Sequence, residues 1–239
     1  MSGPKTAMVM AAGLGTRMRP LTNDRPKALV EVAGRPLIDH TLDRLQAAGV
    51  ERAVVNVHAF ADLLEAHLKA RAAPTIAISD ERAELLETGG GMKKALPLLG
   101  EGPFWGANID CVWIETGRPA LEAMAQAWDP ARMDVLLMLA PTATSLGFHA
   151  EGDFFLETDG ALRFRGEAPV APWLYVGLHI AKPAVFEGTP EGAFSLTRIW
   201  RPLAERGRLH GFAPEGLWMH AGDPAARDVA EARLKAVAA

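Results

Sequence analysis

Residues 7–22 read AMVMAAGLGTRMRPLT, and this stretch decides the fold. Its first six residues are all apolar, and they give way at once to Gly13 and Gly15. A short apolar run that ends in glycines is typical of a buried parallel strand followed by a tight turn. Glycines let the backbone bring its N–H groups close to a ligand, and N–H groups ahead of a helix favour phosphate. The stretch therefore predicts a strand and a phosphate-binding loop.

Two familiar phosphate loops do not fit this stretch. A Walker A loop needs a Gly-Lys pair, which the chain lacks, and the dinucleotide fingerprint needs a third glycine where Met18 stands. The loop instead carries Arg17, and Lys27 follows ten residues later. Arginine offers a planar fork of donors and lysine a point charge, so the pair suits a triphosphate.

Outward from the loop, strands alternate with helices. This order is typical of βαβ units, so we expect a Rossmann-like, mostly parallel sheet flanked by helices. The expected strands are residues 54–57, 74–78, 104–108 and 135–140, and the expected helices are residues 37–48, 60–70 and 119–128.

After residue 141 the pattern changes. Residues 154–158 and 162–164 flank Asp159-Gly160, which is a hairpin signal, and residues 173–180 predict one more strand. The Ala-rich residues 224–239 predict a terminal helix. We expect one domain over residues 1–239, with antiparallel strands added in its C-terminal half.

The composition excludes several classes of protein. The chain has 239 residues, 49% of them hydrophobic, and a net charge of −4, so neither disorder nor a nucleic-acid-binding surface is indicated. Cys111 is the only cysteine, which rules out a disulfide within the chain. The N-terminal apolar run is far shorter than the roughly 20 residues of a membrane span. It also lacks the usual cleavage pattern of a signal peptide. We therefore expect a cytoplasmic protein with no membrane partner.

The motifs also carry a family resemblance. The string AAGLGTRMRPLT, followed by RPKALVEVAGRPLI at residues 25–38, resembles the signature of sugar-1-phosphate nucleotidylyltransferases. Three further strings are most similar to the N-acetylmuramate-1-phosphate uridylyltransferases of bacterial cell-wall recycling: LETGGGMKKALPLLG (86–100), PFWGANIDCVW (103–113) and LWMHAGDP (217–224). The resemblance implies a GT-A-like fold with a nucleotide-binding half (1–141) and a sugar-binding half with a C-terminal helix (142–239). It also implies that UTP and a sugar 1-phosphate give a UDP-sugar and pyrophosphate.

The resemblance also assigns roles to residues. Arg17 and Lys27 would be catalytic, with Arg17 on the leaving pyrophosphate and Lys27 between the nucleotide and sugar phosphates. Asn108 and Asp153 would contact the sugar. The nucleotide would be bound by Ala12, Gly13, Gly15, Thr16, Arg17, Lys27, Thr88, Gly89, Gly90 and Asn108. Three consecutive glycines at 89–91 fit a close approach of the ligand.

The expected cofactor is Mg²⁺, with Asp110 as the best ligand because carboxylate oxygen suits this ion. Two departures from the family pattern surround it. Ile109 replaces the glycine of an Asn-Gly-Asp motif, and His220 stands where relatives carry a second metal-binding aspartate. Imidazole suits softer ions such as Mn²⁺ better than Mg²⁺. His220 could bind a metal, act through water or contact phosphate, and Asp223 could supply the second carboxylate.

Alternatives remain at this point. Base choice depends on pocket contacts, so a guanylyl- or cytidylyltransferase for another sugar 1-phosphate is the nearest alternative. Ile109 and His220 also motivate a nucleotide-sugar-binding homologue with weakened activity. An NAD-dependent oxidoreductase is disfavoured by Met18. The sequence leaves the oligomeric state open.

Overall fold

A computed structural model describes residues 3–238 of the chain. Six α-helices and three 3₁₀ helices accompany thirteen strands in this part. The helices are α1 (Leu37–Ala47), α2 (Ala61–Lys69), α3 (Glu87–Leu99), α4 (Ala120–Ala127), α5 (Thr197–Glu205), α6 (Pro224–Ala238), η1 (Thr16–Met18), η2 (Lys27–Leu29) and η3 (Pro183–Phe186). The strands are β1 (Thr6–Met10), β2 (Glu31–Val32), β3 (Arg35–Pro36), β4 (Arg52–Val57), β5 (Thr75–Asp80), β6 (Phe104–Asn108), β7 (Cys111–Glu115), β8 (Val135–Pro141), β9 (Phe154–Leu156), β10 (Leu162–Phe164), β11 (Trp173–Ala181), β12 (Leu209–Phe212) and β13 (Gly216–His220).

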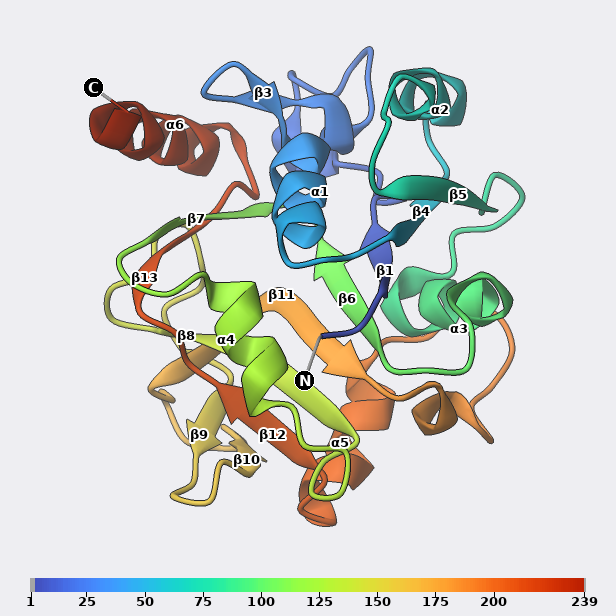
Figure 1. The fold of residues 1–239 in the computed structure, drawn as a ribbon. Coiled ribbons are helices and arrows are strands. Elements are labelled where there is room, and N and C mark those ends of the chain that lie inside the picture. Colours follow the sequence, from blue (N-terminus) through green and yellow to red (C-terminus); the bar gives the residue numbers. More distant parts are fainter. Residues whose placement is uncertain (1–2, 239) are drawn as a thin grey trace.

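Nine strands form one central sheet (Figure 1). Strands β6, β1, β4 and β5 are parallel neighbours, as the alternating pattern predicts. Strand β11 pairs antiparallel with both β6 and β8. Strand β9 pairs with β11 and in turn with β10, also antiparallel, whereas β12 runs parallel to β8. The expected α/β sheet with added antiparallel strands is therefore confirmed, and strands of both halves of the chain share it.

The two faces of the sheet bury separate cores. Along β1, Ala7 and Val9 face the core that packs under α1, α2 and α4, whereas Met8 faces the core under α3 and α5. This alternation is what a parallel strand covered on both faces requires. Gly106 in β6 lies against the ring of His179, where an added Cβ would come within 2.1 Å of the ring.

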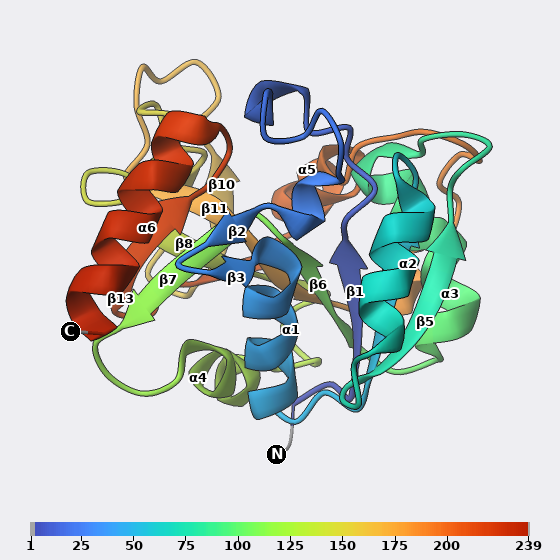
Figure 2. The ribbon, with the colours of Figure 1, turned by 90° about the horizontal axis from the view of Figure 1, so that it is seen from above.

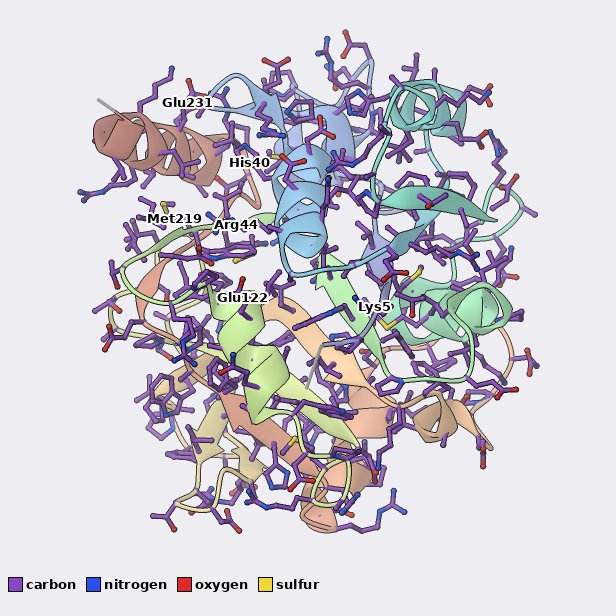
Figure 3. All side chains as sticks on the ribbon, in the orientation of Figure 1. Lys5, His40, Arg44, Glu122, Met219 and Glu231 are labelled. Atoms are coloured by element: carbon purple, nitrogen blue, oxygen red, sulfur yellow. The ribbon has the colours of Figure 1, made fainter. Side chains whose placement is uncertain are left out.

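A small sheet of β7 and β13 lies beside the central sheet. Its antiparallel register places His220 opposite Cys111, and Trp113 stacks on Trp218 at 5.1 Å. Arg44 of α1, labelled in Figure 3, holds this sheet by donating to the Trp113 carbonyl and pairing with Glu115. Figure 2 shows α6 beside β13 and the hairpin of β2 and β3, on the side away from α2 and β5. The pairing therefore brings together residues that are 101 to 109 positions apart in the sequence.

Several elements differ from the sequence-based expectations. Residues 87–99 form α3, which the sequence pattern does not predict. The strands β2, β3, β7, β12 and β13 also lie outside the predicted set. The strand expected to extend to residue 158 ends at Leu156. The turn at Asp159-Gly160 does join two antiparallel strands, with Gly160 at φ +90°. Among the described residues, no helix combines the length and apolar character that crossing a bilayer requires.

Candidate active site

A cavity of about 400 Å³ opens at the carboxyl ends of β1 and β6. This is the edge of an open α/β sheet where ligands bind. Nine of the residues predicted for the site line it: Ala12, Gly13, Gly15, Thr16, Arg17, Lys27, Thr88, Asn108 and Asp110. The sequence motifs therefore converge on one cavity, although they come from separate parts of the chain.

The loop between β1 and η2 faces this cavity. Gly15 takes φ +63°, and an added Cβ would lie 3.0 Å from Cβ of Lys27, so glycine here lets Lys27 come close. Around Gly13 an added Cβ would meet open space. From Gly13 to Arg17, the described residues offer the backbone N–H groups no protein acceptor, and Arg17 is exposed with no carboxylate partner. These donors can therefore meet phosphate oxygens.

Asn56 and Glu81 support the loop through hydrogen bonds, and no motif marks either residue in the sequence. Asn56 Oδ1 accepts hydrogen bonds from the N–H groups of Ala11 and Ala12 at 2.6 and 3.2 Å. Its Nδ2 donates to Glu81, whose other oxygen accepts from the N–H of Leu86. Both side chains are buried and line the cavity. They lie at the carboxyl ends of β4 and β5. Polar residues at such strand ends indicate a ligand site, and this is the only feature of the sequence that points to them.

Lys27, Asp110 and His220 meet at one carboxylate oxygen. Oδ2 of Asp110 lies 2.8 Å from Nζ of Lys27 and 3.2 Å from Nε2 of His220. The three side chains are only 12%, 21% and 19% exposed, respectively. The pairing of β7 with β13 brings His220 here, and the backbone adds a hydrogen bond from the N–H of Ala221 to the Asp110 carbonyl.

These contacts keep Asp110 ionised. Burial alone would raise the pKa of its carboxyl, but the hydrogen bond with His220 and the charge of Lys27 outweigh burial and hold this pKa well below its usual range. The neighbouring Cys111 behaves in the opposite way. Burial, reinforced by the charge of Asp110, raises the pKa of its thiol well above the ordinary value, so Cys111 is a poor nucleophile.

The glycines at 89 and 90 do not line the cavity. Their N–H groups donate to the carbonyl of Phe194, and an added Cβ would lie 2.4 Å from the Phe194 ring at Gly89 and 2.2 Å from the Gly192 carbonyl oxygen at Gly90. The close approach that these glycines permit is therefore made by the chain itself. Contact of Gly89 and Gly90 with a nucleotide stays a prediction.

Asp153 and Asp223 also lie outside the cavity lining. Asp153 accepts a hydrogen bond from the N–H of Tyr175 and pairs with His149. Asp223 is exposed and accepts from the N–H of Ala226, so it caps the start of α6, where Pro224 follows. Both carboxylates have partners within the protein. Contact of Asp153 with the sugar and of Asp223 with a metal stay predictions.

The donor set can be compared with the needs of a divalent cation. Asp110 offers a carboxylate at the cavity, and Mg²⁺ in such sites uses one or two carboxylates together with substrate phosphates. Within residues 3–238, no group of three His, Cys, Asp or Glu side chains is arranged to hold an ion. The residues therefore fit a cation that binds together with a nucleotide.

Comparison with known proteins agrees with this geometry. Residues 7–149 match the model of the MobA-like NTP transferase domain. The chain is 65% identical to the N-acetylmuramate alpha-1-phosphate uridylyltransferase of Caulobacter vibrioides over 97% of both chains. It is 34% identical to the enzyme of that name from Neisseria meningitidis, over 90% of this chain and 92% of that one. A solved structure of UDP-glucose pyrophosphorylase with UDP-glucose shares the fold, with a TM-score of 0.78 and 19% identity over 98% of this chain and 99% of that one.

Proposed function

The chain belongs to the MobA-like NTP transferase family and is a nucleotidyltransferase, and from that premise we propose that it makes UDP-N-acetylmuramate from UTP and N-acetylmuramate 1-phosphate. The observation that carries the proposal is the 65% identity to the Caulobacter uridylyltransferase over nearly the full length of both chains. The cavity supports it, because exposed N–H groups, Arg17 and Lys27 suit a triphosphate. The setting we propose is cell-wall recycling in the cytoplasm.

The reaction needs positioned charge rather than a protein nucleophile. An oxygen of the sugar phosphate forms a bond to the α-phosphorus of UTP, and the bond from that phosphorus to the pyrophosphate oxygen breaks. Charge then develops on the leaving pyrophosphate, where preorganised donors are most effective. Arg17 and the N–H groups of residues 13–17 are the donors available for it.

Lys27 is suited to the reacting centre. Its side chain is 12% exposed and held by Asp110, so its ammonium loses little freedom on meeting two phosphate groups. Asn56 and Glu81 would act indirectly, by fixing the loop that presents the N–H groups. A divalent cation on Asp110 and the nucleotide oxygens would supply further charge neutralisation.

The test is an assay of substrate pairs. Incubation with UTP, Mg²⁺ and N-acetylmuramate 1-phosphate should release pyrophosphate and yield the UDP-sugar. A phosphate assay coupled to pyrophosphatase detects the pyrophosphate, and mass spectrometry detects the UDP-sugar. GTP or CTP with mannose or glucose 1-phosphate is the comparison. Turnover of one of these pairs without turnover of the first would overturn the substrate assignment. Tight UTP binding without any turnover would instead indicate a binding homologue.

A further inference from the structure

Strand β11 bulges next to Asn108, a residue that lines the cavity. It pairs with β8 through Tyr175 opposite Leu139 and through His179 opposite Leu137, so four residue steps of β11 lie against two steps of β8. Two steps of a strand span about 7 Å and four steps about 13 Å, so the bulge draws positions 175 and 179 toward each other. Bulges are common next to active sites, where they redirect a side chain.

A hydrogen bond between two side chains closes this bulge. The hydroxyl of Tyr175 lies 2.7 Å from Nδ1 of His179, and both rings meet the ring of Trp200 of α5 edge-on, at centroid distances of 4.9 and 5.8 Å. The ring of His179 is buried and lies over Gly106 of β6, where a side chain would not fit. The main-chain N–H of Tyr175 is held as well, because it donates to Asp153 at 2.9 Å. The bulge is therefore fixed at both of its ends.

The middle of the bulge supports Asn108. Gly177 stands midway between Tyr175 and His179, with φ +85°, and an added Cβ there would lie 2.8 Å from Cβ and 3.1 Å from Nδ2 of Asn108. In the described part of the chain, the side-chain amide of Asn108 has no hydrogen-bond partner, and only its main-chain carbonyl accepts a bond, from the hydroxyl of Thr41. The position of this amide therefore depends on its packing against Gly177.

We propose that Tyr175 and His179 are positioning residues, whose hydrogen bond clamps the bulge and thereby holds the amide of Asn108 where it meets a substrate. The inference rests on the proposed function, because Asn108 would contact the nucleotide or the sugar phosphate there. Neither Tyr175 nor His179 lines the cavity, so both act through the bulge and Asn108. A misplacement of about 1 Å can cost up to 10²-fold in rate, so loss of the clamp should be visible in the kinetics.

The test is a double-mutant cycle read by pyrophosphate release, at a temperature well below the melting point of each variant. Tyr175→Phe removes only the hydroxyl and should lower kcat/KM by about tenfold. In an Asn108→Ala background, the same change should alter kcat/KM by no more than about twofold, because the group that the clamp positions is gone. Tyr175→Phe combined with Arg17→Ala is the matched control. Arg17 shares no contact with the bulge, so these two losses should multiply.

Substitutions of the histidine distinguish the hydrogen bond from packing. His179→Gln keeps a group that can bond to the hydroxyl of Tyr175, so kcat/KM should stay within about threefold of the wild type. His179→Leu fills the space without a polar atom and should match Tyr175→Phe. A loss in Tyr175→Phe that is equally large in the Asn108→Ala background would overturn the clamp and leave the proposed function intact.

A crystal structure of Tyr175→Phe gives a readout that does not depend on turnover. The amide of Asn108 should be shifted or disordered relative to the wild type, and an amide in its wild-type place would overturn the proposal. Absence of turnover by the wild type with every substrate pair would instead overturn the proposed function.

Discussion

At the scale of single residues, Asp110 organises the charges of the cavity. It accepts contacts from Lys27 and His220 on one oxygen, and its pKa stays below the usual range despite burial. Lys27 is thereby held beside the phosphate loop before any substrate arrives. Arg17 differs, because it is exposed and has no such partner in the described part of the chain.

We expect Arg17→Ala and Lys27→Ala each to lower turnover by about 10²-fold or more, because each removes a charge that stabilises developing phosphate charge. Pyrophosphate release under saturating substrates measures this loss. Thermal unfolding should hardly change in Arg17→Ala, since an exposed side chain without a partner contributes little stability.

Arg19→Ala is the matched control for Arg17→Ala. Arg19 is exposed in the same loop but does not line the cavity, so its loss should leave turnover within about twofold. Equal losses at positions 17 and 19 would show that the loop responds to total charge rather than to the placement of Arg17.

Individual residues differ in how far the sequence could predict them. Lys27 and Asp110 could be found because each follows a recognisable motif, but their contact joins residues 83 positions apart and depends on the fold. Asn56 and Glu81 could not be found in this way, because an amide near the end of one strand and a carboxylate directly after another form no motif. In the sequence, Asp223 fits a helix cap as well as it fits a metal ligand, because proline follows it directly.

At the scale of elements, α3 shows tertiary contacts overriding local preference. Three glycines and Pro97 oppose a helix, each at a cost of about 1 to 3 kcal/mol relative to alanine in a helix interior. The helix forms because Gly89 and Gly90 fit under the segment at residues 192–194, and Met92 and Leu99 are buried. From the sequence alone, the three glycines favour a ligand at the place where this segment lies.

Gly90→Ala should therefore destabilise the fold by about 1–3 kcal/mol, because its Cβ would overlap the carbonyl of Gly192. Each kcal/mol lowers the melting temperature of a chain of this size by about 2–4 °C, which calorimetry resolves. Gly102→Ala is the control, since an added Cβ there meets nothing within 4 Å. If both variants melt like the wild type, residues 192–194 yield easily and the packing explanation is wrong.

Some strands can be predicted from the sequence and others cannot. The apolar runs that became β1, β4, β6 and β8 could be recognised because a strand buried on both faces is apolar throughout. The members of the β7–β13 pair could not, because each is short and half-buried, and each is stabilised by a partner about 100 residues away in sequence.

At the scale of the whole molecule, a net charge of −4 coexists with a cavity to which we assign a triphosphate. Arg17 and Lys27 supply positive charge at the cavity, and the lining also contains Asp110, which pairs with Lys27, as well as Glu81 and Glu87. Of the strands after residue 141, β11 enters the central sheet between β6 and β8, β9, β10 and β12 extend that sheet outward, and β13 pairs with β7 in the small sheet.

His179 gives the fold a sensitivity to mild acid. It is buried between Gly106 and Trp200, and burial lowers its pKa to about 3. The unfolded chain binds a proton near pH 6.5, so stability is greatest above that pH and falls as the pH drops from 6.5 toward 3. Between pH 7 and pH 5 this residue should cost about 2 kcal/mol, measurable by urea unfolding.

His179→Gln should reduce that loss, because glutamine does not titrate and can still bond the hydroxyl of Tyr175. The pKa values of His40 and His210 are also lowered, mainly by burial, so a smaller loss in the same direction should remain. An unchanged pH dependence in the variant would rule out His179 as the source.

Ribosomal synthesis gives the β7–β13 pairing a further consequence. The growing chain emerges from its N-terminus, so the phosphate loop and Asp110 leave the exit tunnel long before residues 216–220. Strand β7 has no antiparallel partner until then, and Asp110 can meet His220 only after β13 has emerged. A nascent or truncated copy that lacks β13 would therefore carry the loop, Lys27 and Asp110 without the contact from His220.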